Sequence, residues 1–179
     1  MLTGLRLVSE AAELAARRHS GQARKGHGDE PYINHLAEVA SLLASVTDGA
    51  DAELVAAGWL HDTIEDTDTS RDELAERFGA RVAGLVEEVT DDMTLAKSER
   101  RRLQVIEAPE KSPGAKLIKI ADKISNVRVR VFFEPDADQR DELADYLAWA
   151  EQVVKGCRGV NAKLDALFDE AVAHARETL

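Results

Sequence analysis

Residues 54–60 read LVAAGWL, and residues 61–66, which follow directly, read HDTIED. The first segment is apolar throughout, which predicts the body of a buried helix. The second segment places one imidazole and three carboxylates at the end of that helix, although burying charge without partners is costly. On a continuous helix, residues four apart in this segment would share a face. The stretch therefore predicts either a divalent-metal site with a carboxylate left for proton transfer, or a solvated helix end with a chance His-Asp pair.

The composition limits the classes of protein that have to be considered. The chain has 179 residues, of which 44% are hydrophobic and 32% charged, and we expect one globular domain over residues 1–179. The single cysteine excludes a disulfide framework and a thiolate zinc site. The net charge of −11 argues against nucleic acid and anionic membranes as partners. No run of 18 apolar residues and no signal-like start is found, so we expect a cytoplasmic location.

Helical periodicity recurs along the whole chain, and no segment reads as a convincing strand. The sequence therefore predicts an all-α fold, a single compact multi-helix domain. Polar residues predict several helix starts, at Asn34, Asp51, Ser70 and Ser112. The expected helices are residues 5–19, a helix opening at 31–35, the helix after residue 51 that carries HDTIED, and then 70–79, 82–89, 114 to about 130, 143–155 and 160 to about 177.

Four potential metal ligands lie on or at the ends of these helices: His35, His61, Asp62 and Asp122. Asp122 lies inside an apolar helical pattern, with Asn126 four residues later on the same face, and a buried carboxylate needs a cation. Two imidazoles and two carboxylates suit Mn²⁺, Fe²⁺, Zn²⁺ or Co²⁺, and the ligand set does not choose among them.

Acidic and basic residues could complete such a site. Glu65 and Asp66 follow the ligands by one turn and could act on a metal-activated water. Arg24 and Lys25 lie in a glycine-rich loop, and Lys97 and Arg101 are four apart in the densest cationic run; all four could hold phosphate oxygens. Ordinary surface charge is the alternative for both pairs. The combination indicates phosphoester hydrolysis of a small anionic substrate.

The motifs also resemble a known family. The pattern His…His-Asp…Asp is similar to the HD-domain phosphohydrolases, and more narrowly to the hydrolase domain of RelA/SpoT proteins, closest to the small stand-alone hydrolases of the metazoan SpoT homologue type. The segments that carry this resemblance are residues 19–22, 24–25, 31–35, 61–69, 86–92, 112–117, 119–123 and 149–156.

The resemblance implies an all-helical, Mn²⁺-dependent enzyme that removes pyrophosphate from the 3′ position of the alarmone (p)ppGpp. It also implies roles for individual residues: His35, His61, Asp62 and Asp122 as metal ligands, Glu65 and Asp66 as the catalytic acidic pair, Asn126 against the nucleoside, Arg24 and Lys25 beside the base or its phosphates, and Lys97 and Tyr146 completing the pocket.

Some positions depart from the family pattern. Leu36 follows the second-helix histidine where relatives usually have proline, and Val129 replaces a usually polar residue. Asp138 and Glu142 stand where relatives carry an aromatic residue and an arginine. Two alternatives therefore stay open: a nucleotide phosphatase of relaxed specificity, for instance for the 2′-phosphate of NADPH, and a non-catalytic nucleotide-binding regulator. The oligomeric state is not indicated by the sequence.

Overall fold

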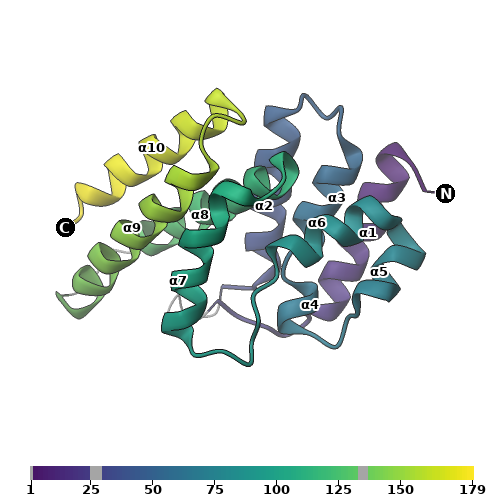
Figure 1. Cartoon of the computed structure of the whole chain (residues 1–179), viewed down its shortest axis with the longest axis horizontal. Helices are drawn as coiled ribbons and strands as arrows, with labels where there is room; N and C mark the ends of the chain where they lie inside the picture. The colour runs from purple at the N-terminus through teal and green to yellow at the C-terminus, as the bar shows by residue number, and fades with distance from the viewer. Residues whose placement is uncertain (1, 25–29, 133–136) are drawn as a thin grey trace. The chain divides into compact units, whose positions relative to one another are not determined.

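The computed structural model describes residues 2–24, 30–132 and 137–179, with only the backbone of 137–139 (Figure 1). Helices dominate the described residues, where the one β-type contact is an isolated bridge between Ala23 and Pro31. The predicted all-α class is confirmed. The chain forms two compact units, Met1–Met93 and Thr94–Leu179. The expectation of one domain over the whole chain stays a prediction.

The first unit is built around one buried helix. Its elements are α1 (Gly4–Arg18), α2 (Ile33–Val46), α3 (Ala52–Leu60), α4 (Thr63–Asp66), α5 (Arg71–Phe78) and α6 (Ala80–Val89). Helix α3 packs against α1, α2 and α6. The stretch Leu54–Gly58 and Leu60 are buried, so the prediction of a core helix from the apolar run is confirmed.

A close approach between α2 and α3 depends on Gly58. A Cβ atom placed there would lie 2.6 Å from Leu43 Cδ1 and 3.3 Å from Ala40 Cα, both on α2. Only a residue without a side chain fits this contact without displacement. Because α2 carries His35 and α3 ends just before His61, Gly58 sets how near the two histidines can come.

Three of the four predicted helix caps are confirmed. The Asp51, Ser70 and Ser112 side chains accept hydrogen bonds from backbone N–H groups three residues later, at 3.0, 3.1 and 3.3 Å. Asn34 as a cap is wrong. Helix α2 begins at Ile33 with Tyr32 at the cap position, and the Asn34 N–H already donates to the Pro31 carbonyl, 3.0 Å away, so the first turn starts before Asn34.

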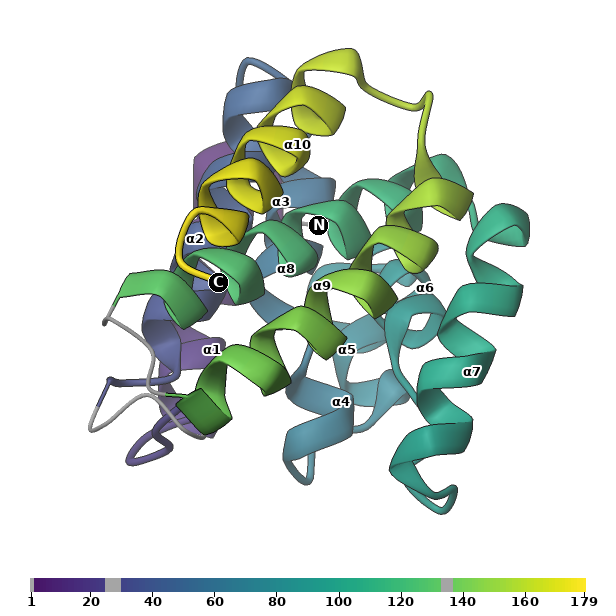
Figure 2. The same cartoon turned by 90° about the vertical axis from the view of Figure 1, so that its left-hand side faces the viewer.

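The second unit contains α7 (Lys97–Glu107), the 3₁₀ turn η1 (Ala108–Glu110), α8 (Pro113–Phe132), α9 (Ala137–Cys157) and α10 (Ala162–Arg176), as Figure 2 shows from a second direction. Helix α8 packs against α9 and α10, and α7 packs against α9. Helix α9 is longer than the predicted 143–155. Helix α10 starts two residues later than predicted because the Asn161 side chain caps it, accepting from Leu164 N at 3.0 Å.

No helix among the described residues is both long and apolar enough to cross a membrane.

Candidate metal centre and acidic pair

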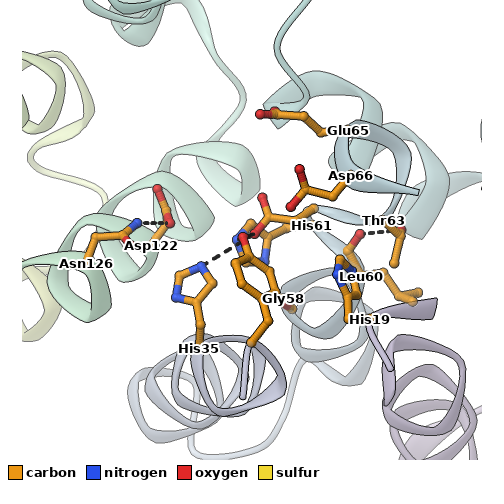
Figure 3. Close-up of polar contacts among 12 residues, drawn as sticks. His19, His35, Gly58, Leu60, His61, Thr63, Glu65, Asp66, Asp122 and Asn126 are labelled. Atoms are coloured by element: carbon orange, nitrogen blue, oxygen red, sulfur yellow. Dashed lines mark hydrogen bonds and ion pairs between the residues drawn. The ribbon is translucent and has the colours of Figure 1, made fainter. Parts of the chain in front are cut away.

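Three of the predicted ligands converge within the first unit. His35 is in the first turn of α2, whereas His61 and Asp62 form the turn between α3 and α4. One ligand atom from each lies within 4.8 Å of the other two. The Nε2 atoms of His35 and His61 are 3.5 and 3.0 Å from Asp62 Oδ2. Both histidines are almost fully buried, so the cluster is a shielded site and not a solvated helix end (Figure 3).

The hydrogen bonding of His61 makes it suitable as a ligand. Its Nδ1 donates to the Gly58 carbonyl, 2.9 Å away, which fixes the tautomer of the neutral ring and leaves a lone pair at Nε2. That lone pair faces a carboxylate oxygen of Asp62 at 3.0 Å. Two lone-pair atoms this close need a shared cation, either a proton or a metal ion. A carbonyl that orients a ligating imidazole is also the usual second partner of histidine in metal sites. The donor set therefore fits a divalent metal.

The Asp62 carboxylate is stabilised in its charged form. Burial alone would raise the pKa of its carboxyl. When a proton is the shared cation, the charge of the protonated His61 ring and the hydrogen bonds from both histidines outweigh burial and hold the pKa well below its usual range. Tyr32 adds a hydrogen bond, its hydroxyl donating to Asp62 Oδ2 at 2.6 Å. The carboxylate is thus ionised, as a metal ligand must be.

The acidic pair lies on its own short helix. The predicted continuous helix through His61, Glu65 and Asp66 is wrong, because α3 ends at Leu60 and α4 begins at Thr63. Side chains take over the last carbonyls of α3: His61 Nδ1 donates to Gly58 O, and Thr63 Oγ1 donates to Leu60 O at 2.6 Å. The break lets His61 and Asp62 turn towards His35.

Glu65 and Asp66 are held by different partners. Glu65 Oε2 accepts from the backbone N–H of Asp91 at 3.1 Å. Asp66 Oδ2 accepts from Gln22 Nε2 at 3.2 Å, and Asp66 is exposed. Figure 3 shows the Glu65 and Asp66 carboxylates above His61 in that view.

Asp122 belongs to the second unit and has two partners there. Its Oδ1 accepts from Asn126 Nδ2 at 2.6 Å, and its Oδ2 accepts from Lys123 Nζ at 2.7 Å (Figure 3 draws the Asn126 contact). The expectation that this carboxylate needs a cation is met by Lys123, which is buried. The role of Asp122 as fourth metal ligand stays a prediction.

The predicted phosphate-binding residues are distributed over both units. Arg24 is buried, and its Nη2 donates to His35 Nδ1 at 3.4 Å. Lys25 lies outside the described residues. Lys97 is the exposed first residue of α7. Arg101, on the same helix, places its guanidinium 4.8 Å from the centroid of the Trp149 ring.

Tyr146 lies in a cluster of aromatic rings and cations within the second unit. Its ring meets the Trp149 ring edge-on at 5.5 Å, and the Arg130 guanidinium lies 3.9 Å from its centroid. Lys123 Nζ lies 4.6 Å from the centroid of Trp149. Burial raises the pKa of the Tyr146 hydroxyl, which therefore stays protonated at neutral pH. Among the departures from the family pattern, Glu142 is exposed and Val129 buried, whereas the Asp138 side chain lies outside the described residues.

Several residues of these clusters carry no predicted role. Lys123 and Arg130 follow Asp122 and Asn126 by one and four residues on α8, and Trp149 follows Tyr146 by three residues on α9. Adjacency in the chain therefore indicates Lys123, and helical spacing indicates Arg130 and Trp149. Gln22 and Tyr32 contact the site from a loop, and no periodicity indicates such contacts.

Comparisons with known proteins agree with this arrangement. A family model described as HD domain matches residues 11–145, and the chain belongs to the HD domain family. It is 49% identical over 165 residues to the guanosine-3′,5′-bis(diphosphate) 3′-pyrophosphohydrolase MESH1 of Homo sapiens, covering 92% of this chain and 90% of that protein. The Mus musculus protein of the same name is 48% identical over 165 residues, covering 90% of this chain and 92% of that protein.

A solved structure gives the same result for the fold. The protein reported as a metazoan ortholog of SpoT that hydrolyses ppGpp superposes with a TM-score of 0.89 at 38% identity, over 100% of both chains. The resemblance to the small stand-alone SpoT-like hydrolases is confirmed.

Proposed function

We propose that this chain is a metal-dependent (p)ppGpp 3′-pyrophosphohydrolase, which converts ppGpp to GDP and pyrophosphate. The observation that carries the proposal is the buried cluster of His35, His61 and Asp62 directly before the Glu65–Asp66 pair, in a chain 49% identical to a named enzyme of this activity. A bound divalent ion would lower the pKa of water towards neutrality and polarise a phosphoryl oxygen.

The residues of the chain have separate tasks in this reaction. A water oxygen bonds to the phosphorus that carries the ribose 3′ oxygen, and the bond between this phosphorus and the 3′ oxygen breaks. The 3′ oxygen takes up a proton, and the water oxygen leaves as part of pyrophosphate. His35, His61 and Asp62 would hold the ion, and Glu65 and Asp66 would accept and return the protons. The tautomer of His61, set by the Gly58 carbonyl, keeps Nε2 available for the ion.

The identity of the ion and its fourth ligand rest on the family resemblance. We infer Mn²⁺ as the metal and Asp122 as the fourth protein ligand on that basis. The donors also suit Fe²⁺, Zn²⁺ and Co²⁺. Arg24, Lys25, Lys97, Arg101, Asn126 and Tyr146 are proposed to bind the substrate, with (p)ppGpp as the small-molecule partner.

A product assay tests the proposal. The metal-stripped protein is reloaded separately with Mn²⁺, Zn²⁺, Fe²⁺ or Co²⁺ and incubated with ppGpp, pppGpp, pGpp and NADPH. GDP and pyrophosphate from ppGpp support the proposal. Orthophosphate from NADPH alone would replace it with a nucleotide phosphatase, and binding of ppGpp without turnover under every metal would indicate a regulator.

A further inference from the structure

The loop between α1 and α2 reaches the candidate site from one side with three side chains. Gln22 contacts Asp66, Arg24 contacts His35, and Tyr32 contacts Asp62. The two arms of the loop are joined by backbone hydrogen bonds, from Arg24 N to Glu30 O and from Tyr32 N to Gln22 O, both 2.9 Å. The three contacting side chains therefore belong to one loop whose two arms are hydrogen-bonded to each other within the first unit.

Gln22 is held in a defined orientation by His19. The Nδ1–H of His19 donates to Gln22 Oε1 at 2.7 Å, and Gln22 Nε2 then donates to Asp66 Oδ2 at 3.2 Å. The reversed amide would point its oxygen at the Asp66 carboxylate, so that two acceptors would face each other. The orientation with Nε2 towards Asp66 is the one that satisfies both neighbours.

His19 is itself fixed. The residue is 3% exposed, its backbone N–H donates to the Ala15 carbonyl at 3.0 Å, and its ring stacks on Tyr32 with centroids 5.1 Å apart. Tyr32 in turn donates to Asp62. His19 thus connects to the acidic pair through Gln22 and to the ligand cluster through Tyr32.

Asp66 needs such a partner more than Glu65 does. Glu65 is anchored by a backbone N–H, which the fold fixes. Asp66 is the last residue of a four-residue helix and is exposed. Within the described parts of the chain, Gln22 is the one side chain that bonds its carboxylate. Without Gln22, the Asp66 carboxylate would sample several rotamers in water.

We propose that Gln22 is a positioning residue, oriented by His19, that holds the Asp66 carboxylate in place for proton transfer. This inference rests on the proposed function for the step it serves, and its geometry stands independently. When a group that transfers protons is misplaced, turnover falls more than the affinity for substrate does.

Kinetics of three variants provide the first test. Gln22→Ala is expected to lower kcat about tenfold, because an unanchored Asp66 carboxylate spends less time in the geometry for proton transfer, with KM changed less than about twofold and metal content unchanged. Gln22→Glu has the same shape and can still accept from His19, but it cannot donate to Asp66, so it is expected to lose at least as much turnover. A purely structural role would be rescued by this isosteric change. His19→Phe, which keeps the stack on Tyr32 and removes the donor, should resemble Gln22→Ala.

Controls separate positioning from general damage. Gln152, an exposed glutamine on α9, serves as the matched site, and Gln152→Ala should leave kcat unchanged. In the Asp66→Asn background, Gln22→Ala should add little further loss, because its effect passes through Asp66. Wild-type kcat in Gln22→Ala, or full rescue by Gln22→Glu, would overturn the inference.

A second readout does not need activity. The side-chain amide signals of Gln22 in a ¹H–¹⁵N spectrum, assigned by their loss in Gln22→Ala, should shift in Asp66→Asn, while those of Gln152 should not. Unshifted Gln22 signals would overturn the positioning inference even if ppGpp is hydrolysed. If the wild-type protein does not hydrolyse ppGpp at all, the proposed function fails, and this spectrum still decides whether Gln22 holds Asp66.

Discussion

Replacing Gly58 by alanine tests whether the approach of α2 and α3 builds the metal cluster. The added Cβ would lie 2.6 Å from Leu43 Cδ1, a side-chain end that can move, and 3.3 Å from the backbone atom Ala40 Cα, which can yield only if the helices separate. Overpacking of this kind costs about 1–3 kcal/mol, whereas alanine gains about 1 kcal/mol over glycine inside a helix. The net expectation is a loss of about 0–2 kcal/mol in the free energy of unfolding.

The more specific effect of Gly58→Ala should appear in metal binding. Separation of α2 from α3 moves His35 away from His61 and shifts the Gly58 carbonyl that orients the His61 ring. We expect metal affinity to fall about 10- to 100-fold, as when an outer partner of a metal ligand is lost. The measurements are urea unfolding and calorimetric titration of the metal-stripped protein with Mn²⁺.

Gly84 provides the matched control. It lies inside α6, and a Cβ there would meet nothing within 4 Å. Gly84→Ala should therefore gain about 0.5–1 kcal/mol in stability with unchanged metal affinity. If Gly58→Ala also gains stability and binds Mn²⁺ as tightly as the wild type, the close approach of the helices does not set the geometry of the cluster.

Three further predictions test the proposed roles of single residues. Glu65→Ala should keep the metal and lose turnover, whereas Asp122→Ala should lose the metal; elemental analysis beside kcat decides, and the opposite pattern would reverse the assignment. Asp51→Asn keeps the helix cap but loses the ion pair with Arg81. The hydrogen bond from Arg81 lowers the pKa of the Asp51 carboxyl, although burial acts in the opposite direction. The substitution should cost about 0.5–1 kcal/mol at neutral pH. A lowered pKa contributes its full stability above the ordinary carboxyl value of 3.8 and loses it as the pH falls through the lowered pKa of the folded state. The difference should therefore shrink in acid, and an equal difference at neutral and at acidic pH in urea unfolding would contradict the ion-pair account. Lys97→Ala should raise KM for ppGpp at a cost of about 1.5–3 kcal/mol in kcat/KM, less at high salt; an unchanged KM would make this lysine ordinary surface charge.

Features that depend on neighbours in sequence could be predicted well. The caps at Asp51, Ser70 and Ser112 each need one side chain and a backbone N–H three residues later, and both lie within one turn. The apolar run before His61 likewise predicts burial directly from its composition. The ligand types in His35, His61 and Asp62 were also apparent, because imidazole and carboxylate side chains next to a core helix are costly without a shared cation.

Features that depend on a break in periodicity were predicted less well. A continuous helix through residues 61–66 follows from spacing alone, yet the structure ends α3 at Leu60 because His61 and Thr63 compete for its last carbonyls. Residue type alone predicts Asn34 as a cap. The helical turn had already begun at Pro31, where the carbonyl accepts from Asn34 itself.

The contacts that give the site its order join residues far apart in the sequence, and these could not be predicted from local patterns. Gln22 and Asp66 are 44 positions apart, and Tyr32 and Asp62 are 30 apart. Each pair includes one residue from the loop before α2 and one from the segment after α3, so the pairing depends on how α1, α2 and α3 pack. That packing depends in turn on Gly58. From the sequence alone, this glycine is only a residue with low helix propensity, and nothing indicates the close contact that it allows. The substitution that changes least chemically, glycine to alanine inside a helix, is therefore expected to disturb the metal cluster more than the loss of an exposed charge.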